Sequence, residues 1–113
     1  MADLTATTAR ALRYKLCSAS ALEAGHARTF LVEGEHVAVF RQRDGVLFAT
    51  QGYCPHAGGP LADGVFSSGR VVCPLHARKF ELSTGKCMEE NACLKTYPVT
   101  EQDGAIVLEV ACA

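Results

Sequence analysis

Short runs of apolar residues separated by turn residues constrain the fold of this chain more than any other feature. Residues 12–16 alternate between apolar and basic side chains, which is typical of a half-buried strand. The pairs Glu33-Gly34, Asp44-Gly45 and Asp103-Gly104 separate further apolar runs, and such pairs favour tight hairpin turns. The strands expected from these patterns cover residues 12–16, 28–32, 36–42, 46–50, 71–72, 80–82, 94–101 and 105–110.

No segment sustains the 3.6-residue periodicity of a helix, and residues 21–27 are expected to form a loop or a single helical turn. Many short strands with regular turn signals predict an all-β fold, a small antiparallel sandwich or barrel. The 113 residues correspond to one domain of ordinary size. Residues 1–113 are therefore expected to form a single domain, ordered over residues 12–110.

The charge balance and the apolar runs argue against several classes of protein. Eleven basic and twelve acidic residues leave a formal net charge of −1, so nothing indicates a nucleic-acid or membrane partner. The longest apolar runs fall far short of the ~20 residues of a membrane span, and residues 1–16 lack the apolar region of a secretory signal. We therefore expect a soluble cytoplasmic protein. In that reducing compartment the six cysteines are not expected to form disulfides, even Cys87 and Cys93, which are close in sequence.

Two short segments each pair a cysteine with a histidine: Cys54-Pro55-His56 and Cys73-Pro74-Leu75-His76. Sixteen residues separate the two segments, and each follows an expected strand. Two thiolates and two imidazoles are the ligand set of a [2Fe-2S] cluster in which one iron has sulfur ligands and the other has nitrogen ligands. The pattern therefore predicts that Cys54, His56, Cys73 and His76 bind such a cluster, and it points to electron transfer.

Zinc is the alternative, because two cysteines and two histidines also suit a tetrahedral zinc ion. Zinc fingers, however, usually group two cysteines before two histidines, whereas each segment here carries one of each. The single residue between Cys54 and His56 is also shorter than the usual zinc-ligand spacing. These two differences favour the cluster over zinc.

Beyond the ligands, three segments resemble the Rieske family of iron–sulfur proteins. They are CPHAGGPLADG (54–64), CPLHARKFELSTGKC (73–87) and LKTYPV (94–99), and with the upstream strands the resemblance covers residues 14–110. It implies a Rieske-type [2Fe-2S] cluster in a subdomain made of two loops, here 51–62 and 73–80. It also implies that Cys54 and Cys73 bind the inner iron, while His56 and His76 bind the outer iron near the surface.

The ligand segments differ from those of cytochrome bc-type Rieske proteins. Those members carry a disulfide between the two loops, and Gly59 and Leu75 stand at the corresponding positions here. A serine and a tyrosine that hydrogen-bond the cluster in those members correspond to Arg78 and Phe80. Fewer such donors stabilise the reduced cluster less, so we expect a reduction potential toward the lower end of the roughly −150 to +300 mV Rieske range.

Among low-potential relatives, residues 80–99 look most like the small subunit of assimilatory NAD(P)H nitrite reductase. Such a subunit accompanies a large flavin and sirohaem subunit that reduces nitrite to ammonia, and it is not catalytic alone. The alternative is a stand-alone Rieske ferredoxin that passes electrons from a flavin reductase to a ring-hydroxylating oxygenase. A second alternative is a non-redox interaction subunit with a structural cluster or zinc.

Residues beside the ligand histidines form a candidate docking face for a redox partner. Ala57, Leu75 and Ala77 supply apolar surface there, and Arg78 and Lys79 add positive charge. Transient redox partners use small interfaces, which such a patch can provide.

Overall fold

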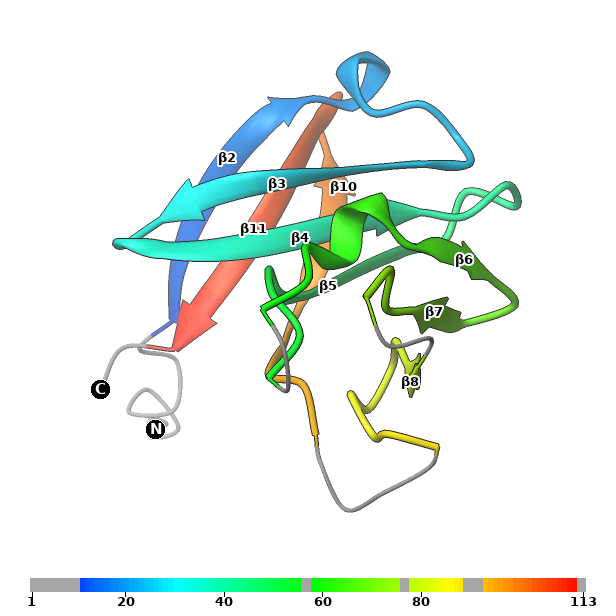
Figure 1. Ribbon diagram of the computed structural model, residues 1–113. Helices are drawn as coiled ribbons and strands as arrows, with labels where there is room; N and C mark the ends of the chain where they lie inside the picture. Colours follow the sequence, from blue (N-terminus) through cyan, green and yellow to red (C-terminus); the bar gives the residue numbers. More distant parts are fainter. Residues whose placement is uncertain (1–10, 56–57, 76–77, 89–92, 112–113) are drawn as a thin grey trace, which may run out of the picture.

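The computed structural model describes residues 11–55, 58–75, 78–88 and 93–111, and this part of the chain is all-β, as the sequence predicts (Figure 1). Every pairing between its strands is antiparallel. Two 3-10 helices, η1 (Ala19–Ala21) and η2 (Leu61–Asp63), accompany the strands. No helix in these ranges is long and apolar enough to cross a membrane. The strands are β2 (Ala11–Ser18), β3 (His26–Val32), β4 (Glu35–Arg41), β5 (Leu47–Gln51), β6 (Val65–Ser67), β7 (Arg70–Val72), β8 (Lys79–Glu81), β9 (Thr96–Tyr97), β10 (Val99–Gln102) and β11 (Ala105–Ala111).

Within the described ranges the strands form three sheets. The sheets β10-β11-β2 and β3-β4-β5-β9 cross one another in Figure 1 and bury a common core. The third sheet, β6-β7-β8, is small and lies to one side, at the lower right of Figure 1. The second candidate ligand loop follows β7, so this small sheet positions part of the site.

Strand β4 separates two cores because both of its faces are buried. Val37 and Val39 point into the base core, whereas Ala38 and Phe40 alternate with them and point into the loop core. The base core consists of Leu22, Val32, Val37, Val39, Ala49, Tyr97, Ile106 and Leu108. The loop core consists of Ala38, Phe40, Cys54, Leu61, Val71, Cys73, Phe80, Leu82, Cys87 and Leu94.

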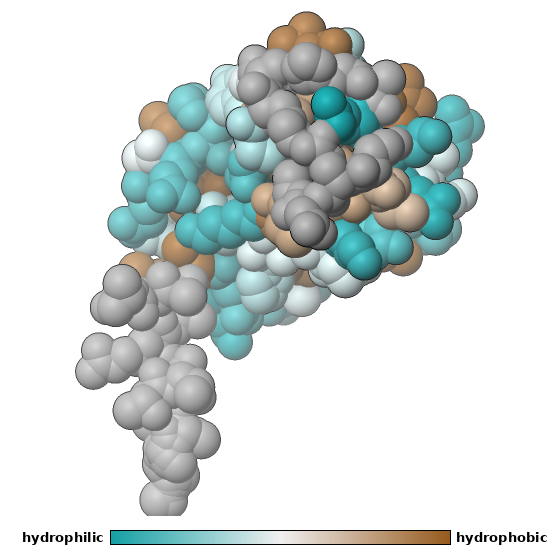
Figure 2. Space-filling model, turned by 60° about the horizontal axis from the view of Figure 1, so that its bottom comes forward, coloured by the Kyte–Doolittle hydropathy of each residue, from teal (hydrophilic) through white to brown (hydrophobic). Residues whose placement is uncertain are grey.

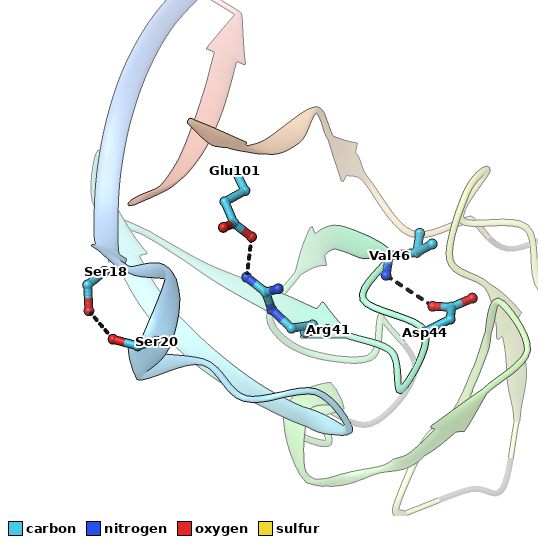
Figure 3. A network of polar contacts seen from close by, with 6 residues as sticks. All are labelled: Ser18, Ser20, Arg41, Asp44, Val46 and Glu101. Carbon is cyan, nitrogen blue, oxygen red and sulfur yellow. Dashed lines mark hydrogen bonds and ion pairs between the residues drawn. The ribbon is translucent and has the colours of Figure 1, made fainter. Parts of the chain in front are cut away.

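Three hairpins of the described chain turn on the same backbone geometry. At Glu33-Gly34, Ser68-Gly69 and Asp103-Gly104, a residue with φ near 50° precedes a glycine with φ near 77°. Two consecutive left-handed residues match the twist of antiparallel strands, and glycine adopts this conformation without steric cost. The expected two-residue turn at Asp44-Gly45 lies instead within a longer connection, residues 42–46, in which Asp44 Oδ1 accepts a hydrogen bond from the Val46 N–H at 3.0 Å (Figure 3).

The prediction of a single strand over residues 94–101 is wrong. The chain forms β9 and β10 instead, and β9 pairs with β5 while β10 pairs with β11. Pro98 lies between them and has no backbone N–H, so it cannot continue a hydrogen-bonded ladder. The chain passes from one large sheet to the other at this proline.

Several short elements also depart from the sequence-based prediction. β6 and η2 were not expected, and the single helical turn considered at 21–27 lies earlier, as η1. In η2, Leu61 is fully buried in the loop core, so this turn closes the first ligand loop from beneath.

An ion pair joins the two large sheets. Arg41 in β4 donates through Nη2 to Glu101 Oε1 in β10 at 3.0 Å (Figure 3). The Arg41 side chain is mostly buried, and its Nε has no hydrogen-bond partner in the described part of the chain. Glu101 is therefore a specific partner for a guanidinium that water reaches poorly.

Candidate metal centre

The first candidate ligand loop follows β5 and closes on itself through backbone hydrogen bonds. The Cys54 N–H donates to the Gly59 carbonyl at 2.8 Å, and the Gly58 N–H donates to the Cys54 carbonyl at 2.8 Å. At the base of the loop, the Gly52 N–H donates to the His36 carbonyl at 2.8 Å, and a Cβ on Gly52 would lie 2.8 Å from His36 Cβ. Glycine permits this close approach, which anchors the loop to β4.

The second candidate ligand loop rises from the small sheet, because β7 leads directly into Cys73. The Cys73 N–H donates to the Arg78 carbonyl at 2.8 Å, so residues 73–78 close into a loop that returns to β8. Below this loop, Val71 in β7 pairs with Phe80 in β8, and both side chains are fully buried. The loop therefore lies above a fully buried apolar pair.

The two loops meet at Gly59. A Cβ on Gly59 would lie 3.0 Å from Cys73 Sγ and 3.0 Å from Leu75 Cγ. Cys54 and Cys73 are only 2% and 1% exposed, and both belong to the loop core. The structure thus buries the two candidate thiol ligands in one core beneath adjoining loops.

This arrangement fits the sulfur side of a Rieske-type cluster. Two thiols in adjoining buried loops can supply the two thiolates, and the absent side chain at Gly59 leaves room beside Cys73 Sγ. The two candidate imidazole ligands, His56 and His76, lie outside the described residues. Within the described ranges no three His, Cys, Asp or Glu side chains gather to hold a metal ion. The described part therefore contributes the cysteine half of the candidate ligand set.

An open hollow of about 560 Å³ lies beside Cys73. Val65 and Leu75 line it and are 76% and 61% exposed. Figure 2 shows this end of the molecule, where brown apolar residues and teal hydrophilic residues both border the grey segments. Sequence reasoning missed Val65 because β6 has only three residues. The available signal was the apolar pair 65–66, which mirrors 71–72 across the Ser68-Gly69 turn.

Of the remaining cysteines, Cys87 shares the loop core with Cys54 and Cys73, whereas Cys112 lies outside the described residues. Lys86 and Cys93 are bridge partners, so their side chains share a face, while Cys87, adjacent to Lys86, points to the opposite face and into the loop core. Cys93 is exposed and forms no disulfide. This geometry explains why Cys87 and Cys93 are poorly placed to form one.

The candidate docking face is described only in part. Ala57 and Ala77 lie outside the described residues, whereas Leu75 and Lys79 are exposed and Arg78 is half-buried. Of the other histidines, His26 is exposed on β3, whereas His36 is exposed on β4 and its ring packs edge-on against Tyr53 of the first ligand loop, with ring centroids 5.1 Å apart.

The fold and the site together define a small antiparallel β protein whose two cysteine-bearing loops close against each other, the framework of an iron–sulfur protein. The Rieske [2Fe-2S] domain profile matches residues 12–98, and the chain belongs to the Rieske family. Its cofactor is therefore a Rieske-type [2Fe-2S] cluster, and its general function is electron transfer. The family resemblance and the all-β fold expected from the sequence are both confirmed.

Known relatives include components of several redox systems. The chain is 35% identical over 99 residues to the ferredoxin subunit of 3-phenylpropionate/cinnamic acid dioxygenase from Photorhabdus laumondii, covering 85% of this chain and 92% of that protein. The solved structure of a candidate NADPH nitrite reductase small subunit matches with a TM-score of 0.76 and 33% identity, covering 86% of this chain and 97% of that one. Cholesterol 7-desaturase nvd 1 of Ciona intestinalis is 32% identical over 108 residues, which cover 88% of this chain, but the chain spans only 23% of that protein.

Proposed function

We propose that Cys54, His56, Cys73 and His76 hold the cluster, with the cysteines on the inner iron and the histidines on the outer iron. The observation that carries this assignment is the burial of Cys54 and Cys73 in loops that meet at Gly59. We further propose that residues 1–113 form one domain in which loops 51–62 and 73–80 bind the cluster.

The bound cluster supplies one-electron redox chemistry. The protein sets the conditions under which that chemistry occurs. The backbone hydrogen bonds of Cys54 and Cys73 fix the two thiols, and the loop core below them excludes water. Phe80, fully buried in that core, has no polar atom with which to hydrogen-bond the cluster, which supports the low reduction potential expected above.

We propose that the chain works as the small subunit of an NAD(P)H-dependent nitrite reductase, in the cytoplasm, with a large flavin and sirohaem subunit as its partner. Two observations support this role. Residues 80–99 resemble such subunits, and a candidate small subunit of this type shares the fold over 97% of its length at 33% identity. In this role the chain passes electrons and does not itself bind nitrite.

A ferredoxin of a ring-hydroxylating oxygenase is the second candidate. The observation that favours it is the 35% identity to a dioxygenase ferredoxin subunit over 92% of that protein's length. Its partners would be a flavin reductase as electron donor and an oxygenase as acceptor.

Stopped-flow reduction tests these roles. Purified chain carrying its cluster is mixed with the NADPH-reduced large nitrite reductase subunit and, separately, with an NADH-reduced flavin reductase of a dioxygenase system. We expect faster reduction by the large subunit, and faster reduction by the flavin reductase would favour the ferredoxin role.

We expect Cys73→Ser to lose the visible cluster spectrum and all electron transfer, while Cys93→Ser, the exposed control, keeps both. Full turnover of the nitrite reductase with Cys73→Ser would leave the chain a non-redox interaction subunit.

A further inference from the structure

The small sheet β6-β7-β8 has one buried face and one outer face. Phe66, Val71 and Phe80 are register partners that point inward, and all three pack in or against the loop core. Side chains alternate along a strand, so the neighbouring residues point outward. The outer rows are Val65, Val72 and Lys79 in one and Ser67, Arg70 and Glu81 in the other.

Two hollows on this outer face adjoin each other. The hollow beside Cys73 has a volume of about 560 Å³ and includes Val65, Val72, Pro74 and Leu75. A second hollow of about 270 Å³ is lined by Val65, Ser67, Ser68, Arg70, Val72 and Lys79. Because Val65 and Val72 line both, one depression runs from the candidate ligand Cys73 to Arg70.

The two ends of this depression differ in chemistry. At the Cys73 end, Val65 and Leu75 are 76% and 61% exposed, and removing such apolar side chains from water favours association. At the other end, Arg70 and Lys79 line the second hollow, and none of the described carboxylates lines it with them. Asp63 lines the first hollow, whereas Glu81, the register partner of Arg70, accepts a hydrogen bond from Thr84 Oγ1 through its Oε1. Among the described residues, basic side chains therefore line the second hollow and not the first.

We propose that the outer face of β6-β7-β8 is the docking face for the redox partner protein. The partner presents an apolar side chain to Val65 and Leu75, and it places a carboxylate against Arg70. Such a partner sits over the strand that leads into Cys73, so it approaches the cluster from the cysteine side. The proposal rests on the electron-transfer role proposed above and names the surface chemistry of the partner.

This face extends the docking patch expected from the sequence. Leu75 and Lys79 belong to both, whereas Val65 and Arg70 become part of the surface only because β6 and β7 pair. The same geometry supplies matched controls on other sheets. Leu31 on β3 is 67% exposed, and Lys15 on β2 is exposed and basic.

The test compares reduction rates of four variants by the flavoprotein that reduces the wild-type chain fastest, either the large nitrite reductase subunit or the dioxygenase flavin reductase. We expect Val65→Asp and Arg70→Glu each to slow reduction at least about tenfold, because they place negative charge in the interface. The Arg70→Glu rate is also expected to depend less steeply on salt. The control variants Leu31→Asp and Lys15→Glu are expected to be reduced at the wild-type rate. The visible spectrum and thermal unfolding of each variant check that the cluster and the fold are intact.

Two results would overturn the docking face. If Val65→Asp and Arg70→Glu are reduced at rates within twofold of the wild-type rate, the docking face is wrong, while the electron-transfer function is unaffected. Equal slowing by Leu31→Asp and Lys15→Glu would make the effect one of net charge rather than of this surface. A wild-type chain reduced by neither flavoprotein would contradict both proposed roles, and the docking face with them.

Discussion

At the residue scale, the site depends on a missing side chain. Gly59 does not adopt a left-handed backbone, so the need for glycine there comes from space. Its Cα faces Cys73 Sγ and Leu75, and a Cβ would reach both at 3.0 Å, closer than ordinary van der Waals contact. The inter-loop contact that a disulfide makes in bc-type relatives is here made by Leu75 resting in the space beside Gly59.

We expect Gly59→Ala to weaken cluster retention, because the new methyl group pushes the two loops apart. The matched control is Gly58→Ala, where a Cβ has open space but φ is +70°, so the cost is backbone strain of about 1 kcal/mol without crowding. The measurements are iron content after gel filtration and the rate of Cys73 alkylation in iron-free protein. Equal iron content and equal alkylation rates in the two variants would show that the contact at Gly59 is unimportant.

At the scale of the element, β4 separates the packing of the base from the packing of the site. Its alternating side chains fill two cores, and on the loop side Phe40 packs edge-on against Phe66 with ring centroids 5.1 Å apart. The loop core also contains the two candidate thiol ligands. Packing on one face of β4 should therefore affect the cluster, and packing on the other face should not.

A pair of core substitutions tests this separation. Phe40→Leu and Val39→Ala each leave a cavity and are expected to lower the free energy of unfolding by about 1–3 kcal/mol. We expect Phe40→Leu to accelerate cluster loss in mild denaturant, well below the unfolding midpoint, whereas Val39→Ala loses the cluster only as the whole domain unfolds. Cluster absorbance and far-ultraviolet circular dichroism, followed together, separate the two behaviours. If the denaturant concentrations at which cluster absorbance and circular dichroism are lost differ by the same amount in both variants, the two cores behave as one.

The elements also show what the sequence could predict. Hairpins at Glu33-Gly34 and Asp103-Gly104 followed from local turn chemistry, and each ligand loop was expected after a strand, since these features depend on neighbours in the chain. The switch at Pro98 was missed because alternation continues through it while the hydrogen-bonding partner changes. At the site, the four candidate ligands came from spacing and resemblance, but the contact of Gly59 with Cys73 and the outward position of Val65 depend on pairing between distant segments.

At the scale of the whole molecule, polar contacts between distant segments hold the base together. Arg41 joins the two large sheets through Glu101. Elsewhere the Tyr97 hydroxyl donates to Glu35 Oε1 at 3.2 Å, and Lys95 Nζ lies 3.6 Å from the same oxygen. Burial raises the pKa of Tyr97 above its ordinary value of 10.0, and the attraction of Tyr97, followed by that of Glu35, raises the pKa of Lys95.

These shifts predict a loss of stability in alkali. Both groups keep their protons to a higher pH in the folded chain than in the unfolded chain, so the unfolded chain binds fewer protons above about pH 10. The free energy of unfolding should therefore fall as pH rises from 10 through the folded-state pKa values. We expect Tyr97→Phe to flatten this decline, because it removes the shifted phenol and its attraction for Lys95. Urea titrations between pH 8 and pH 11 measure the free energy of unfolding at each pH. If it falls with pH equally steeply in the wild type and in Tyr97→Phe, Tyr97 is not responsible for the decline.

The two-faced burial of β4 has a consequence for how such a chain can evolve. A slip of one residue along this strand would exchange the contents of its two sides, sending the bulky ring of Phe40 toward Ile106 and a smaller valine toward the thiols. Insertions and deletions of single residues should thus be far rarer within β4 than in the connections around it, and related chains should differ in length mainly outside this strand.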